Sequence, residues 1–536
     1  MNSDYIIVGA GSAGCVLANR LTENPNNKVL LLEAGPPDSN PWIHIPIGYG
    51  KTMFHPDLNW GFQSEPEPNL NGRSIYTPRG RTLGGSSAIN GMIQIRGQAE
   101  DFDEWERQGA TGWNGQEVLR YFIKSERNSR GPGPYHGGSG PLSVSDIKGR
   151  HELADALIAA ARELGIPRTN DFNGASQEGA GYLQLTTRNG FRCSTARAYL
   201  RPAKRRPNLQ VITGARVLRV LFDGRRATGV EYRQGDQTVQ AHAAREVLLS
   251  AGAIQSPQLL QLSGIGPDDL LSAMGISVVS HHPGVGANLQ DHLAQRFMFQ
   301  CTRPITTNDA LRNPLRKLQT GLRYALFRDG PMAVGVMIAG LITRVMPDAQ
   351  TPDMQLFLST VSADDRGRKP HLFSGFTIAF YPMRPSSRGH IRITSNDPTA
   401  APAIAYNYLS TNYDQAITLA GARLVRHLTG TGSLASLIIR ELRPGPDAQT
   451  DADILAAIRE SATTGFHPVG TCRMGEGDGA VVDSRLRVHG VDGLRVVDAS
   501  VMPTLVSGNT NAATIMIAEK AADLIREDAA PHAALP

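Results

Sequence analysis

The first residues that could do chemistry are three glycines near the start of the chain, spaced to hold a phosphate group. Residues 9–14 read Gly-Ala-Gly-Ser-Ala-Gly, between the apolar run Tyr5 to Val8 and a helix-like stretch ending at Leu21. In such a turn the first glycine bends the chain, the second admits a pyrophosphate, and the third lets the helix pack on its strand. The helix N-terminus offers unpaired N–H groups to phosphates. The pattern predicts dinucleotide binding, against the alternative of a purely structural turn.

An acidic residue stands at the distance that this motif requires. Residues 29–33 read Val-Leu-Leu-Leu-Glu, a second buried strand, and Glu33 closes it 19 residues after Gly14. A carboxylate in this place accepts hydrogen bonds from ribose hydroxyls and repels a 2′-phosphate. The sequence therefore predicts FAD or NAD and disfavours NADP. The motif alone does not separate FAD from NAD.

Two later segments combine glycine or histidine with ligand-binding potential. Residues 80–91 contain Gly84-Gly85 followed by two serines, which suits a backbone wrapped around a ligand, and their apolar neighbours predict burial. Residues 466–475 place His467 in a loop punctuated by proline and glycine. A flexible surface loop and a solvated histidine are the alternative interpretations.

The elements that must position these residues predict an α/β protein of more than one domain. A chain of 536 residues exceeds one ordinary core. Residues 296–464 alternate strands and helices without a second fingerprint, which predicts a second domain that shapes a substrate pocket. The other predicted elements are a helix in 103–125, strands at 209–212, 217–222, 230–232 and 246–252, a helix starting at Ser256-Pro257 and running to Leu262, and a helix at 512–525. The turn at Asp223-Gly224 between two of these strands predicts a hairpin.

Composition limits the partners. The net charge of +5 comes from scattered residues, so no nucleic-acid partner is predicted. The four cysteines form no close pair and suit a reducing cytoplasm; no metal site is predicted. We expect no leader or membrane span, because the longest uncharged apolar stretch, Gly330 to Thr343, is too short. Peripheral membrane contact stays open, as does the oligomeric state.

Taken together, the segments resemble the blocks of the glucose–methanol–choline (GMC) oxidoreductase family, in the family's order. The similar blocks are the N-terminal fingerprint and residues 80–90, 252–266, 467–475 and 496–511. One glycine-rich block is generic, but five spaced blocks across nearly the whole chain are specific. Bacterial choline-dehydrogenase-like and sorbose-dehydrogenase-like members are the most similar in pattern.

The resemblance implies an α/β fold (α+β overall) with two domains. A Rossmann-like FAD-binding domain would comprise residues 1–150, 201–295 and 466–536. A discontinuous substrate-binding domain, built on an antiparallel or mixed sheet with helices, would comprise residues 151–200 and 296–465.

The resemblance also implies where FAD would lie. The fingerprint would hold the pyrophosphate, Glu33 the adenosine ribose, and the helix starting near Asn511 would direct its positive end toward the pyrimidine side of the flavin. Some members attach FAD through a histidine where this chain has Ile89, so we expect non-covalent FAD. The implied cofactor-binding residues are Gly9, Gly11, Ser12, Ala13, Gly14, Glu33, Ala34, Gly84, Gly85, Ser86, Asn90, Gly91, Met92, Ile93, Val217, Ala251, Gly252, Asp498, Ala499, Thr510 and Asn511.

For catalysis, His467 matches the family's histidine and Asn511, 44 residues later, matches its His/Asn partner. The histidine would take the hydroxyl proton of an alcohol while hydride passes to flavin N5. Asn511 would orient the alcohol oxygen; a plain helix cap is its alternative role. His292, His390 and His489 are interpreted as solvated or core residues.

The expected substrate is a neutral, primary alcohol, oxidised to an aldehyde or ketone. Choline-oxidising members carry a glutamate for the trimethylammonium group, but residues 331–341 contain no acid and have Met337 and Ile338 instead. Choline, a sorbose-type sugar and an oxidase reaction with O₂ stay open as alternatives.

Outside this activity, two other hypotheses compete: an NAD-dependent dehydrogenase, and a flavin- or nucleotide-binding protein without turnover. Within it, analogy favours a dehydrogenase with a quinone or other acceptor. The predicted location is the cytoplasm or the periphery of the inner membrane.

Overall fold

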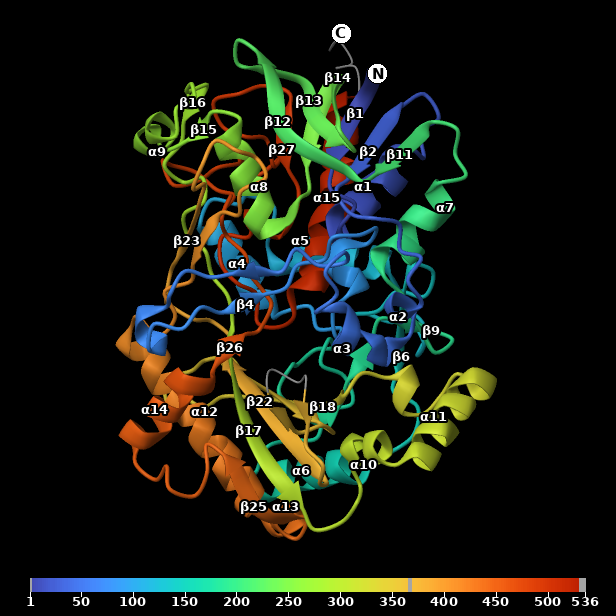
Figure 1. The fold of residues 1–536 in the computed structure, drawn as a ribbon, viewed down its shortest axis with the longest axis vertical. Helices are drawn as coiled ribbons and strands as arrows, with labels where there is room; N and C mark the ends of the chain where they lie inside the picture. The colour runs from blue at the N-terminus through green and yellow to red at the C-terminus, as the bar shows by residue number, and fades with distance from the viewer. Residues whose placement is uncertain (1, 365–368, 530–536) are drawn as a thin grey trace.

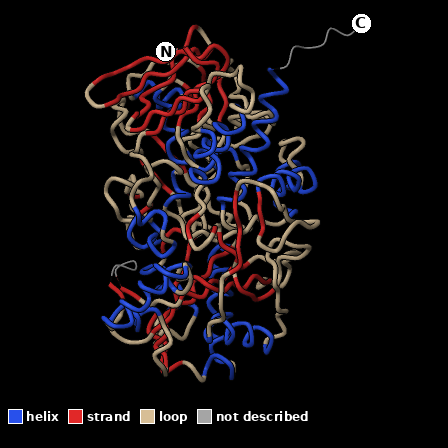
Figure 2. Tube along the Cα trace, turned by 90° about the vertical axis from the view of Figure 1, so that its right-hand side faces the viewer, coloured by secondary structure: helices blue, strands red, loops and turns tan. Residues whose placement is uncertain are grey.

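Two seven-stranded sheets form the frame of the protein, one toward each end of the long axis (Figure 1). The computed structural model describes residues 2–364 and 369–529. Seen from the side, strands gather at the two ends, with helices and loops between them (Figure 2).

The first sheet is the predicted Rossmann-like unit, and its parallel part lies in the order β11-β2-β1-β14-β27. Ile6 pairs with Leu30 on one side and Val247 on the other, and all three side chains are fully buried. Such apolar runs form strands that are covered on both faces. The strands are β1 (Asn2–Val8), β2 (Val29–Glu33), β11 (Leu209–Thr213), β12 (Ala215–Asp223), β13 (Arg226–Gln234), β14 (Gln237–Leu249) and β27 (Leu494–Val496).

Helix α1 (Ser12–Leu21) leaves the glycine turn and packs on α15 (Thr510–Ala529), which in turn packs on α5 (Gly115–Ser125). Arg20 on α1 makes a two-pronged ion pair with Glu519 on α15, at 2.7 and 2.8 Å. The two ends of the chain therefore meet beside the fingerprint. The predicted hairpin around 223–224 is confirmed as β12 and β13.

The helix predicted over 103–125 is two helices, α4 (Ala99–Arg107) and α5. Gly109 and Gly112 between them have φ of +92° and +81°, a left-handed conformation that ends a helix at low cost. Asn114 then caps α5 by accepting from the Glu117 N–H. The helical period was correct, but the break was missed.

The helix predicted to start at Ser256-Pro257 starts four residues earlier, as α8 (Gly252–Leu262). Proline inside a helix leaves the carbonyl four residues before it without its N–H partner. That carbonyl, of Ala253, instead accepts from Thr471 Oγ1 at 2.6 Å. Ser256 is no cap, because its hydroxyl donates to Asp498. The irregularity thus joins α8 to the loop that carries His467.

The second sheet is antiparallel throughout, in the order β25-β17-β22-β19-β18-β7, with β26 on β17. Helices α6 (Glu152–Glu163) and α12 (Asn412–Gly430) pack on it. The strands are β7 (Gly179–Tyr182), β17 (Leu293–Cys301), β18 (Met337–Thr343), β19 (Met354–Ser359), β22 (Gly375–Pro382), β25 (Ile438–Arg443) and β26 (Thr463–Thr464). The predicted fold class is confirmed.

The remaining helices and strands are mostly short. The helices are α2 (Pro41–His44), η1 (Pro46–Gly48), α3 (Tyr49–Thr52), η2 (Pro68–Leu70), η3 (Gly85–Ala88), η4 (Ala196–Leu200), α7 (Arg201–Ala203), α9 (Asp268–Ala273), α10 (Thr307–Arg312), α11 (Pro314–Phe327), η5 (Pro331–Ala333), α13 (Gly432–Ala435), α14 (Asp451–Ser461) and η7 (Ala499–Val501). The strands are β3 (Phe62–Gln63), β4 (Tyr76–Thr77), β5 (Glu126–Asn128), β6 (Leu142–Asp146), β8 (Gln184–Leu185), β9 (Thr187–Arg188), β10 (Phe191–Arg192), β15 (Ile265–Gly266), β16 (Ser280–His281), β20 (Ala363–Asp364), β21 (Lys369–Pro370), β23 (His390–Arg392) and β24 (Ala403–Ala405).

The predicted domain boundaries stay a prediction, and two features bear on them. Strand β17 runs across the proposed boundary at 295/296. Segment 151–200 contributes to both halves, because β7 joins the second sheet while Tyr199 and Leu200 lie in the core of the first.

Candidate active site

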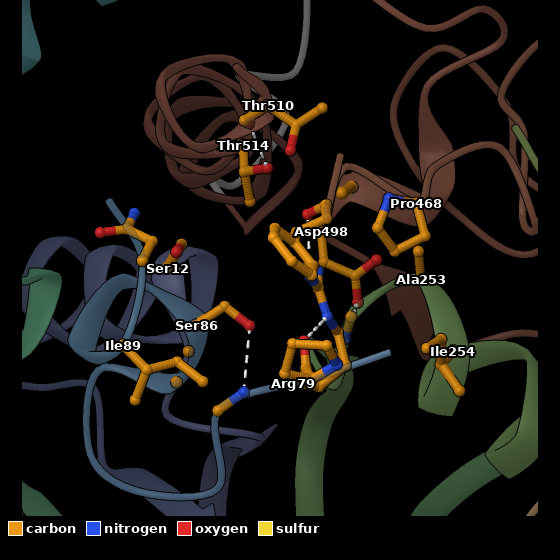
Figure 3. Close-up of a pocket in the computed structure, with 18 of the residues that line it drawn as sticks. Ser12, Arg79, Ser86, Ile89, Ala253, Ile254, Pro468, Asp498, Thr510 and Thr514 are labelled. Carbon is orange, nitrogen blue, oxygen red and sulfur yellow. Dashed lines mark hydrogen bonds between the residues drawn. The ribbon is translucent and has the colours of Figure 1, made fainter. Parts of the chain in front are cut away.

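A long cavity runs between the two sheets and is lined by both. Figure 3 shows residues from opposite sides of this cavity, with Ser12 and Ile89 at the left and Ala253, Ile254 and Pro468 at the right. Most residues predicted for the site line this cavity: Gly9, Gly11, Ser12, Ala13, Glu33, Ala34, Gly85, Ser86, Asn90, Gly91, Met92, Ile93, Val217, Ala251, Gly252, His467, Asp498, Ala499, Thr510 and Asn511. Gly14 and Gly84 do not line it.

One end of the cavity is the glycine turn, in which Gly9 and Gly14 leave no room for a side chain. Gly9 has a φ of +98°, and a Cβ on Gly14 would lie 1.9 Å from the Gly9 carbonyl oxygen. A Cβ on Gly11 would meet nothing nearer than 3.9 Å, so Gly11 borders open space. No side chain caps the N-terminus of α1. This geometry fits a pyrophosphate, as the spacing of the glycines predicts.

Glu33 lies beside that turn and is buried. Its two carboxylate oxygens accept from the Ala10 and Gly35 N–H groups, each at 2.8 Å. Burial raises the pKa of Glu33 to about 7. Each oxygen keeps a second lone pair that can accept from a ribose hydroxyl. The geometry is compatible with the predicted ribose contact.

His467 lies at the other end of the cavity, held by a hydrogen-bond chain from the second sheet. Its Nδ1 lies 2.9 Å from Nδ1 of His292, whose Nε2 lies 2.8 Å from the Met383 carbonyl oxygen. A carbonyl only accepts, so His292 Nε2 carries the hydrogen. Burial lowers the pKa of His292 to about 3, so its Nδ1 is bare and accepts from His467 Nδ1–H.

The same chain defines the reactive atom of His467. Burial, followed by the charges of His292 and Arg79, lowers the pKa of His467 well below its usual value. The ring is therefore neutral, and with Nδ1 protonated its Nε2 carries no hydrogen. The Nδ2 amide of Asn509 lies 3.0 Å from this Nε2 and donates to it. A neutral imidazole with a defined bare nitrogen is what a general base requires.

In the structure Asn509 is the amide hydrogen-bonded to His467, and the pairing predicted for Asn511 stays a prediction. Asn511 Oδ1 accepts from Ser12 Oγ at 2.7 Å, which places its side chain at the glycine turn. The two residues lie on either side of Thr510, the first residue of α15, and point to different ends of the cavity. Sequence spacing alone does not show this, because both asparagines lie at the start of the same apolar helix.

Three further residues escaped the sequence reasoning. Asp291 accepts from the His467 N–H at 2.6 Å, and from the hydroxyls of Tyr408 and Thr464, both at 2.5 Å. His292, interpreted from sequence as a solvated or core residue, is fully buried, and its ring centroid lies 4.2 Å from that of Tyr381. Arg79 donates to the Phe466 carbonyl oxygen. Nothing in their local sequence marks them, because their partners lie far along the chain.

Charge in the cavity is mostly positive. Three arginines line it, Arg79, Arg216 and Arg296, against two carboxylates, Glu33 and Asp498. The Asp498 carboxylate accepts hydrogen bonds from the Gly252 and Ser500 N–H groups and from the Ser256 hydroxyl. Of residues 331–341, Met337 lines the cavity.

Family models for GMC oxidoreductase match residues 3–294 and 385–518. The chain belongs to the GMC oxidoreductase family. This GMC oxidoreductase is 46% identical to mitochondrial choline dehydrogenase of Mus musculus, over 97% of this chain and 89% of that protein. It is 44% identical to an alcohol dehydrogenase [acceptor] of Pseudomonas putida, over 97% and 95%.

Solved structures agree with the family assignment. Pyridoxine 4-oxidase from Mesorbium loti superposes with a TM-score of 0.90 at 31% identity, over 99% of this chain and 100% of that one. A formate oxidase of Aspergillus oryzae, described in terms of its FAD modification, superposes with a TM-score of 0.92 at 27% identity, over 98% of each chain. The recognition made from the sequence blocks is confirmed.

Proposed function

We propose that this GMC oxidoreductase oxidises the CH–OH group of a small, non-cationic alcohol, with His467 Nε2 as the base. The protein is an FAD-dependent oxidoreductase acting on CH–OH donors. The observation that carries the residue assignment is the neutral His467, whose bare Nε2 faces a cavity that begins at the dinucleotide turn. The NAD hypothesis and the non-redox hypothesis do not fit the family.

Each residue of the proposed site has a separate role in the reaction. His467 Nε2 accepts the hydroxyl proton, and the Asn509 amide orients the alcohol oxygen. His292 holds the proton on His467 Nδ1, and Asp291 fixes the backbone of the loop. Bound FAD supplies the acceptor for the hydride that leaves the carbinol carbon. Thr510 opens α15 at the cavity, so the positive end of this helix faces it.

The cofactor fits the cavity as a non-covalent ligand. The bare glycine turn, Glu33 and Val217 provide places for the pyrophosphate, ribose and adenine. Ile89 lines the cavity and offers no nucleophile for a covalent bond. Non-covalent FAD in a domain built from 1–150, 201–295 and 466–536, with 151–200 and 296–465 around the substrate, is part of this proposal.

The charges favour a non-cationic substrate. Arg296 lies on β17 opposite Ala379, two residues from Tyr381, whose ring lies 5.8 Å from the His467 ring. With Arg79 and Arg216 the lining holds three cations against two carboxylates, both of which already accept backbone N–H bonds, and this balance opposes a trimethylammonium group. Choline is the second candidate, favoured by the identity to choline dehydrogenases.

The proposal extends to the electron acceptor and the location. One relative is named as a dehydrogenase with an unspecified acceptor, and others are named as oxygen-dependent enzymes. A quinone-type acceptor for this chain is therefore part of the proposal. Among the residues that the structure describes, no helix has the length and apolarity needed to cross a bilayer. The proposed cytoplasmic location rests on the cysteine spacing.

The test is anaerobic reduction of the bound flavin by neutral alcohols, hydroxy acids and choline, followed in the visible spectrum. We expect bleaching by a non-cationic alcohol, with air added afterwards to distinguish an oxidase from a dehydrogenase. His467→Ala keeps FAD but slows reduction by ~10²–10⁴-fold, whereas His427→Ala, at an exposed histidine of α12, does not. Bleaching by choline alone would reject the substrate class, and an unchanged rate in His467→Ala would reject the base.

A further inference from the structure

Helix α11 projects from the outer side of the lower half of the molecule, beside α10 (Figure 1). Within it only Tyr324 is buried; its hydroxyl donates to the Gly190 carbonyl oxygen at 3.0 Å and its ring contacts Phe191 edge-on. The rest of the helix touches little else. It is held by one side chain and by its two ends.

The exposed side of α11 is a row of leucines. The leucine face consists of Leu315, Leu318, Leu322 and Leu326, which are 71, 60, 53 and 71% exposed. At 3.6 residues per turn these four fall within an arc of about 80°, on the side opposite Tyr324. With Leu311 on α10 and Phe327 at the end of α11, six of the eleven exposed large apolar side chains in the described residues lie within residues 311–327.

Such a cluster indicates an interaction surface rather than chance exposure. Single exposed leucines are normal on soluble proteins, but contiguous apolar patches mark protein or membrane contacts. The occupant is indicated by charge. Residues 310–328 contain five basic residues and no acid; Arg312 and Arg323 pair with Asp309 and Asp329 just outside this segment.

Arg316 and Lys317 are exposed on the helix that carries the leucine face. Helices with Lys/Arg on one side and leucines on the other lie in the interface of anionic bilayers. A second copy of the chain is a poorer occupant, because a leucine-to-leucine contact would leave the basic residues without a counter-charge, whereas an anionic bilayer engages both.

We propose that α11 docks this protein on an anionic phospholipid membrane, with the leucine face in the acyl boundary and Arg316 and Lys317 at the headgroups. From α11 the chain passes through η5 to β18, whose first residue Met337 lines the cavity. Docking would therefore hold the half of the molecule that carries β18 at the bilayer, where a lipid-soluble electron acceptor such as a quinone would be found. The docking itself does not depend on which alcohol is oxidised.

The test is co-sedimentation of the FAD-loaded enzyme with phosphatidylcholine vesicles, with and without phosphatidylglycerol, at low and high salt. We expect binding to the anionic vesicles, weakened by salt. The double variant L318Q/L322Q should bind less at every salt concentration. R316Q/K317Q should partition on the order of 30-fold more weakly to anionic vesicles at low salt. Flavin content and dye-linked turnover should stay at the wild-type level in both.

The matched control is Leu164→Gln, at an exposed leucine (41%) far from α11 in the sequence, which should bind like wild type. Equal sedimentation with neutral and anionic vesicles, or full binding by L318Q/L322Q, would overturn the proposal. So would a concentration-dependent dimer that disappears in L318Q/L322Q without vesicles, which would assign the leucine face to a second copy.

Discussion

At the scale of single residues, the chemistry depends on which nitrogen of His467 carries its hydrogen. The chain from the Met383 carbonyl through His292 leaves only one consistent arrangement, with Nε2 of His467 bare. The pair lies 175 residues apart in sequence. His292 is thus a positioning residue, since its effect on the substrate passes through His467.

Two substitutions of His292 separate its two hydrogen bonds. His292→Asn places an amide oxygen near the Nδ1 position, where it can accept from His467, whereas His292→Gln places its amide near Nε2 and keeps only the Met383 bond. We expect flavin reduction in the Gln variant to be slower than in the Asn variant, on the order of 10–100-fold, because the base loses its orientation. Stopped-flow reduction measures this, with KM changing less than kcat. Equal rates at equal FAD content would contradict the role.

Arg79 provides a pH test of the same base. Burial is the main cause of the low pKa of His467, and the like charge of Arg79 adds to it. Arg79→Met removes that charge, so the pKa of His467 rises and protonation inactivates the base at higher pH. The acid limb of the reduction rate should move to higher pH in Arg79→Met and stay in place in Arg79→Lys. If the acid limb moved equally in Arg79→Met and Arg79→Lys, the charge of residue 79 would not be a cause of the low pKa of His467.

At the scale of elements, the turn between β1 and α1 needs its glycines for different reasons. A Cβ on Gly14 would collide with the Gly9 carbonyl, whereas a Cβ on Gly11 would enter open space that we assign to the cofactor. Gly11 has a φ of −77°, which alanine adopts without strain. Folding and cofactor binding are therefore separable within one turn.

We predict that Gly14→Ala destabilises the protein by about 1–3 kcal/mol, because overpacking forces α1 away from β1. Gly11→Ala should keep the stability of the FAD-free protein and lose FAD. Thermal unfolding with and without added FAD, together with the flavin absorbance, measures both quantities. A Gly11→Ala protein that retains full FAD would place the pyrophosphate elsewhere.

At the scale of the whole molecule, a buried carboxylate ties the two halves together. Asp101 on α4 accepts from Arg384, which follows β22, at 2.9 Å, and from the Ser507 N–H and hydroxyl before α15. Its side chain is 1% exposed. The link joins the second sheet to the segment that carries Asn509.

We expect Asp101→Ala to cost about 3–5 kcal/mol of unfolding free energy, because it leaves a buried set of donors without an acceptor. The control is Arg423→Ala, which breaks an ion pair with Asp451 whose two side chains are each 52% exposed; such pairs contribute about 0–1 kcal/mol. Denaturant unfolding of the two variants compares them. Similar losses would mean that the Asp101 link is not structural.

The sequence by itself determined the elements whose information is local. The glycine turn, Glu33 and the hairpin at 223–224 follow from spacing and periodicity, and the spaced blocks were enough to identify the family. Where local patterns are ambiguous the predictions shifted: helix 103–125 divided at two glycines, and α8 began before Pro257 because Thr471 satisfies a carbonyl that proline leaves open.

Only the tertiary structure decided which side chains face His467. Asn509 and Asn511 are equivalent in sequence terms, but the turn into α15 directs one to the base and the other to Ser12. His292 and Asp291 reach His467 because the start of β17 pairs with β26, just before the His467 loop. A hydrogen bond requires two atoms within about 3 Å, and that distance is set by packing between segments far apart in the chain. Local spacing cannot encode it.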